Sequence, residues 1–147
     1  MSTNQYKGTV RYAGDDFFIG TTPSGHSQAI DTKGDRKSAA SPLELLLISV
    51  AACTAVDVVS ILEKKRQDVT DYNVEIEGSR REEFPKGFTA FHINHIVTGR
   101  SISEKAVADA IELFGNGGKA AGFVDSDHNA GAALFFRATT FYAKFHA

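Results

Sequence analysis

The chain has 147 residues, of which 42% are hydrophobic and 23% are charged, and its formal net charge at pH 7 is −2. This composition fits a single globular domain over residues 1–147, and the balanced charge argues against a nucleic-acid partner. The single cysteine excludes an internal disulfide and indicates a reducing, cytoplasmic setting.

Short strands are predicted in the amino-terminal part of the chain. Glycine, proline and aspartate separate three short segments that have strand character. The predicted strands are residues 6–12, 17–20 and 26–31. The polar segment 32–40 has no apolar periodicity, so we expect a mobile loop there. The first five residues are polar, and we expect no signal peptide.

A long apolar helix follows this loop. Ser41 can cap the helix, Pro42 fits its first turn, and Glu44 completes a Ser-x-x-Glu capping box. The pattern continues to about residue 66, and a helix of roughly 25 residues is about 37 Å long. We therefore expect the central, buried helix of the fold. Its most apolar stretch, residues 45–56, is too short to cross a bilayer, and no membrane contact is predicted.

The second half of the chain predicts a hairpin, a helix and a final strand. Apolar and polar residues alternate from Tyr72 to Glu77, which is typical of a strand with one wet face. A turn at 83–87 leads to a second strand over 88–98. A helix begins near Ser103 and ends at the glycines that start at position 115. An aromatic-rich strand is predicted over 132–145.

Two stretches of the long helix, SPLELLL at 41–47 and AACTAVDVVSIL at 51–62, resemble the signature helix of the OsmC/Ohr family. That family contains osmotically inducible and organic hydroperoxide resistance proteins. Residues 64–78 resemble its YhfA-like branch. The resemblance implies an α+β fold in which two chains form a tightly intertwined homodimer. Two antiparallel sheets then surround the long central helices.

The same resemblance implies a redox role for Cys53. In the peroxidatic members, a thiolate at this helix position attacks the peroxide, and a second cysteine then captures the sulfenic acid. Cys53 matches the first position, but the chain has no second cysteine, and GNGGKAAG stands at 115–122 where the branch carries one. Reduction of a hydroperoxide would therefore need an external thiol as reductant.

Activation of this thiol needs a cation from outside the helix, because a mid-helix position gains nothing from the helix dipole. The family takes its activating arginine from the first hairpin, and Arg11 is the nearest equivalent, so Cys53 and Arg11 are the predicted catalytic residues. The polar loop offers three other cations, and the partner subunit is a further source. The loop cations are Lys33, Arg36 and Lys37. Glu44 lies nine positions before Cys53, on about the opposite helix face, and is assigned to the cap.

The alternative hypothesis makes Cys53 a small buried hydrophobe. The dimer would then be a non-catalytic module that binds a small apolar ligand. We expect neither a metal ion nor a cofactor. His92 and His95 are predicted on opposite faces of a strand, as surface histidines unable to share a metal. The segments 115–119 and 125–129 are expected to be a helix stop and a solvated loop.

Overall fold

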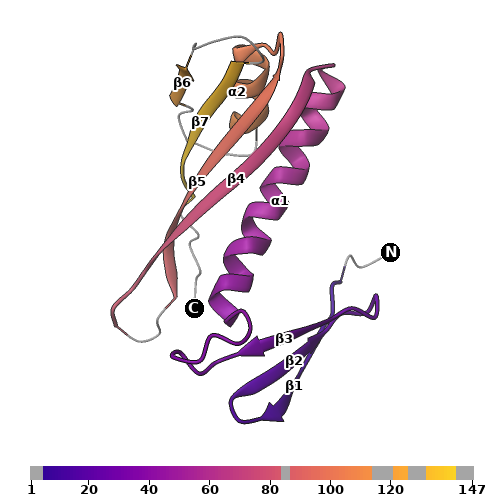
Figure 1. Ribbon diagram of the computed structural model, residues 1–147, viewed down its shortest axis with the longest axis vertical. Helices are drawn as coiled ribbons and strands as arrows, with labels where there is room; N and C mark the ends of the chain where they lie inside the picture. The colour runs from indigo at the N-terminus through magenta and orange to yellow at the C-terminus, as the bar shows by residue number, and fades with distance from the viewer. Residues whose placement is uncertain (1–4, 84–86, 114–120, 126–131, 142–147) are drawn as a thin grey trace. The chain divides into compact units, whose positions relative to one another are not determined.

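The computed structural model describes residues 5–83, 87–113, 121–125 and 132–141, the last two ranges by their backbone. These residues form an α+β structure with two helices and two antiparallel sheets (Figure 1). Two compact units, Met1–Leu46 and Leu47–Ala147, make up the chain. The expectation of a single domain over 1–147 stays a prediction.

The first unit contains a three-stranded antiparallel meander, as the sequence predicts. Its strands are β1 (Thr9–Gly14), β2 (Phe17–Thr21) and β3 (Ser27–Asp31), in the order β1-β2-β3. Between β1 and β2 the chain turns tightly through Gly14, Asp15 and Asp16, whose φ angles are 93°, 47° and 62°. Glycine and aspartate tolerate this left-handed conformation better than most residues, so the turn suits its sequence.

The segment after β3 is a loop, as the sequence predicts, and its hydrogen bonds converge on one side chain. The side chain of Asp31 is only 1% exposed and accepts hydrogen bonds from the backbone N–H groups of Lys33 and Ser38, each at 3.0 Å. Arg36 donates to both oxygens of the same carboxylate. The loop is therefore organised around a single buried acid.

Helix α1 (Pro42–Lys64) begins with the predicted capping box. The backbone N–H of Ser41 donates to Glu44 Oε2 at 2.7 Å, and the N–H of Glu44 donates to Ser41 Oγ at 3.3 Å. The backbone N–H of Ser41 lowers the pKa of Glu44. The helix ends two residues before the predicted position because Arg66 adopts a left-handed φ of 54°, a common helix stop.

The second unit combines a four-stranded antiparallel sheet with the two helices. Its strands are β4 (Asp68–Arg80), β5 (Phe88–Arg100), β6 (Ala121–Asp125) and β7 (Ala132–Phe141), in the order β4-β5-β7-β6. The predicted hairpin is confirmed as β4 and β5, and the predicted second helix as α2 (Glu104–Glu112) (Figure 1). The sequence analysis did not predict β6.

The core of the second unit lies between the carboxyl half of α1, the helix α2 and the hairpin of β4 and β5. Its buried members come from three elements of the fold. They are Val58 and Leu62 of α1, Val97 of β5, and Val107, Ala110 and Ile111 of α2. Val69 and Tyr72 of β4 pack against this cluster. One side of α1 is therefore fixed to the sheet, and its opposite side is left open.

Candidate functional site

Cys53 lies on the open side of α1. Side chains on a helix advance by about 100° per residue, so positions 49, 52, 53 and 56 share one face. We call this face the exposed stripe. It consists of Ser49, Ala52, Cys53 and Val56, all of them exposed. The buried residues Ala51, Val58 and Leu62 lie on the other side. The expectation of a buried helix is therefore correct for one face only.

The exposed stripe is mostly apolar, and it places the thiol outside the core of the second unit. Val56 is 68% exposed and Ile48, at the edge of the stripe, is 61% exposed. A buried, purely structural Cys53 would thus need cover from beyond the helices and the sheet of the second unit. Asp57 follows the thiol by one helical turn. No group of three or more His, Cys, Asp or Glu able to hold a metal ion occurs among the described residues.

Helix α1 is also long and apolar enough to cross a membrane, judged by length and composition alone. Its 23 residues include an 18-residue window of mean hydropathy 2.4, of which 17% is buried. The sequence analysis expected the apolar stretch to be too short to cross a bilayer because it considered only residues 45–56. The apolar character continues through residue 62. Core helices of soluble proteins meet the same criteria, so the absence of membrane contact stays a prediction.

Arg11, the predicted partner of the thiol, is exposed on β1 opposite Ile19 of β2. Arg11 belongs to the first compact unit and Cys53 to the second. Its role as an activating cation stays a prediction, and so does the catalytic role of Cys53. Lys33 and Lys37 are exposed in the segment after β3.

Arg36 is fully engaged within the first unit, unlike the other cations considered. Its Nε and Nη2 donate to Asp31 at 2.9 Å each, and Nη1 donates to Asp15 Oδ2 at 2.7 Å. The guanidinium carbon also lies 3.8 Å from the ring centroid of Phe17. The hydrogen bonds from Arg36 hold the pKa of Asp31 far below its usual range. Arg36 is therefore a structural residue and a poor candidate for activating the thiol.

A buried pair of Tyr72 and His95 was missed by the sequence analysis. The two histidines of β5 lie on opposite faces of the strand as predicted, but His95 is only 3% exposed and is not a surface residue. Its Nδ1 lies 2.6 Å from the Tyr72 hydroxyl, and the two rings stack at 6.0 Å. Burial lowers the pKa of His95 to about 4 and raises the pKa of Tyr72. Both groups are therefore neutral at pH 7, and one hydrogen bond joins the phenol to the imidazole.

The sequence contained a signal for this burial. His95 falls on the same alternation as the apolar residues Phe91, Ile93 and Val97, and the whole set faces the helices. Tyr72 pairs with Val97 and so sits diagonally across from His95. The alternating pattern thus indicates which face of β5 carries His95, although it does not identify Tyr72 as the hydrogen-bond partner.

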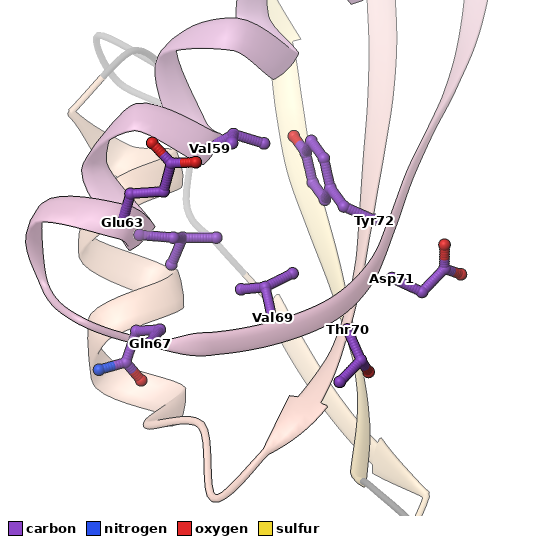
Figure 2. Close-up of a pocket in the computed structure, with 8 residues that line it drawn as sticks. Val59, Glu63, Gln67, Val69, Thr70, Asp71 and Tyr72 are labelled. Atoms are coloured by element: carbon purple, nitrogen blue, oxygen red, sulfur yellow. The ribbon is translucent and has the colours of Figure 1, made fainter.

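Tyr72 also lines a hollow between the end of α1 and the start of β4 (Figure 2). The hollow has a volume of about 360 Å³. It is lined by Val59, Leu62, Glu63, Gln67, Val69, Thr70, Asp71 and Tyr72. Cys53 is not among these residues, so the hollow and the exposed stripe are separate features of α1.

Two other predicted segments cannot be compared with the structure. The glycine-rich residues 115–119 lie outside the described residues. The polar segment 125–129 does as well, apart from Asp125 at the end of β6.

Comparison with known proteins supports the fold and the family resemblance that the sequence of α1 indicates. A family model for OsmC-like protein matches residues 33–116. Protein YhfA of Escherichia coli K12 is 46% identical over 97 residues, which are 65% of this chain and 71% of that protein.

Solved structures extend the similarity over more of the chain. The crystal structure of a hypothetical protein from Aquifex aeolicus VF5 is 30% identical, with a TM-score of 0.67 over 78% of this chain and 82% of that one. An OsmC-like protein from Mycoplasma pneumoniae has the same TM-score of 0.67 over 77% and 81% of the two chains. At 17% identity, the Mycoplasma protein supports the fold alone. The chain therefore belongs to the OsmC-like protein family and has its α+β fold.

Proposed function

We propose that this protein is a cytoplasmic, thiol-dependent redox protein that reduces organic hydroperoxides through Cys53. The observation that carries the proposal is the position of the thiol, which is exposed in the middle of an apolar stripe on the helix that characterises the family. An apolar surface beside a reactive thiol suits the carbon body of an organic hydroperoxide. Membership in the family supports the same chemistry.

The proposed reaction begins with the Cys53 thiolate. It attacks the distal oxygen of the hydroperoxide, the O–O bond breaks, and the alkoxide takes up a proton and leaves as an alcohol. Cys53 becomes a sulfenic acid. Because the chain has one cysteine, an external thiol must attack this sulfur, forming a mixed disulfide and releasing water. A second external thiol then frees Cys53 and leaves as the oxidised disulfide.

Arg11 is proposed to supply the positive charge that stabilises the thiolate. Thiolate stabilisation by a nearby cation is the usual way in which proteins lower the pKa of a cysteine. Lys33 and Lys37 are the alternative sources, since Arg36 is held by two carboxylates. A cation from a partner subunit is consistent with the dimer proposed next.

The protein is proposed to act as a homodimer. The exposed stripe and the neighbouring Ile48 present apolar side chains on a helix whose other face already packs on the sheet. An apolar face of this kind needs cover in water, and a second copy of α1 would provide it. Sedimentation at micromolar concentration should give a dimer. A folded monomer at that concentration would contradict the proposal.

The function is tested by trapping the oxidised thiol. One equivalent of an organic hydroperoxide should consume the thiol of the folded protein and leave a sulfenic acid that dimedone captures. Excess peroxide should drive the sulfur irreversibly to sulfinic acid. Cys53→Ser should abolish the reaction without dissociating the dimer. Steady turnover should require an added thiol or dithiol.

The activating cation is identified with three matched variants, Arg11→Gln, Lys33→Gln and Lys37→Gln. Loss of the relevant cation should destabilise the thiolate and slow its reaction with hydroperoxide about tenfold. The other two variants should react at the parental rate. A thiol that resists hydroperoxide in the folded protein, yet is alkylated after unfolding, would exclude the redox role. The alternative, a non-catalytic dimer that binds a small apolar ligand, would then be preferred.

A further inference from the structure

The hollow at the end of α1 has an apolar floor. Val59 and Leu62 come from the helix, and Val69 and the ring of Tyr72 come from β4. In Figure 2 the side chain of Val59 points toward the Tyr72 ring, whereas the side chain of Asp71 points away from α1. The volume of about 360 Å³ lies in the range of small-molecule sites.

The polar side chains around this floor already take part in hydrogen bonds within the chain. The Tyr72 hydroxyl and His95 Nδ1 share a hydrogen bond of 2.6 Å, and in either direction of this bond the phenol oxygen can accept another. Gln67 donates from Nε2 to the Lys65 carbonyl at 3.0 Å, and its Oε1 accepts from the backbone N–H of Ser103 at 2.7 Å. Neither side chain carries a positive charge that could pair with a carboxylate ligand.

The charge at the hollow is negative. Glu63 contributes an exposed carboxylate, and no lysine, arginine or histidine occurs among the described lining residues. Lys65 is close in sequence, but its Nζ is bound to Asp109 Oδ2 at 2.9 Å. Lys64 and Arg66 are exposed and do not line the hollow. The charge of the lining therefore favours a positively charged ligand.

We propose that this hollow binds a small organic ammonium ion whose apolar body rests on Val59, Leu62 and Val69. Its ammonium group donates to Glu63 and to the hydroxyl oxygen of Tyr72. The site is distinct from the thiol at Cys53 and does not depend on the redox function proposed above.

The test uses three probes of equal chain length, n-hexylammonium, n-hexanol and n-hexanoate. Each is titrated into the full chain carrying Cys53→Ser, which removes thiol chemistry, while the methyl resonances of Val59, Leu62 and Val69 are followed by NMR. n-Hexylammonium should shift these resonances saturably, n-hexanol should bind more weakly, and n-hexanoate should not bind. Glu63→Gln should weaken n-hexylammonium binding about fivefold, as expected for a charge pair near the surface. The matched control Glu112→Gln, an exposed carboxylate at the end of α2, should leave binding unchanged.

Several results would overturn this proposal. Equal binding of the three probes would show an apolar hollow without charge preference. Preferential binding of n-hexanoate would show that Lys64 and Arg66 determine the charge. Absence of saturable shifts with n-hexylammonium would show that there is no site. Resonances that change with protein concentration, with no probe present, would show that a second copy of the chain covers the hollow.

Discussion

Because His95 is buried, we expect the stability of the fold to decrease on acidification. Its pKa is lowered to about 4 in the folded chain from an ordinary value of 6.5 because the ring is buried. Between these two values the unfolded chain binds a proton that the folded chain does not, so acid favours unfolding. The contribution is fully present above pH 6.5 and is lost as the pH falls toward about 4.

The size of the effect follows from the same two values. Each pKa unit corresponds to about 1.4 kcal/mol, so the difference between 6.5 and about 4 gives an upper bound of about 3–4 kcal/mol in the free energy of unfolding. The assay is urea unfolding at fixed protein concentration, followed by circular dichroism from about pH 8 down to about pH 4.5.

Two variants separate the contribution of His95 from that of the carboxylates. His95→Gln retains an acceptor for the Tyr72 hydroxyl but cannot titrate, so its stability should depend less on pH than that of the parent. His92→Gln, on the other face of β5, is the matched loss of a histidine and should retain the loss of stability that is linked to His95. Equal pH dependence in the parent and in His95→Gln would refute the linkage argument.

Two further predictions concern packing and capping. Leu62→Ala should lower the free energy of unfolding by about 2–5 kcal/mol, because this 1% exposed side chain fills the core between α1, α2 and the sheet; a loss below about 1 kcal/mol in chemical denaturation would contradict the assigned packing. Ser41→Ala should cost about 1 kcal/mol through loss of the helix cap, and Glu44→Gln should cost much less because glutamine can still close the box. Loss of hydroperoxide reduction in Glu44→Gln, at unchanged stability, would show that this residue does more than cap the helix.

Local features of the fold could be predicted from the sequence because nearby residues decide them. The capping box of Ser41 and Glu44 and the hairpin of β4 and β5 depend on residues close along the chain. The strand β6 was missed because it is a short segment that pairs with β7 at the far edge of the sheet. The order around Asp31 was missed for a similar reason, since a polar segment gives no sign of the acid that will organise it.

The candidate site was only partly predictable. The family pattern on α1 identifies Cys53, but the helix is apolar on nearly every side. Exposed residues such as Ile48 and Val56 therefore look like core residues in the sequence. The exposure of the thiol became apparent only when the sheet and α2 were seen to cover the opposite side. The buried environment of His95 was hidden by its type, because histidines on strands are more often solvated than enclosed.

At position 36 the planar shape of the guanidinium group matters as well as its positive charge. It donates in one plane to two carboxylates and to the backbone carbonyl of Asp15, and its face lies on the ring of Phe17. The ammonium group of a lysine carries the same charge but lacks both the planar fork and the flat face. Substitution by lysine would therefore conserve the net charge of the chain and still weaken the contacts that join the turn after β1 to the segment that leads into α1.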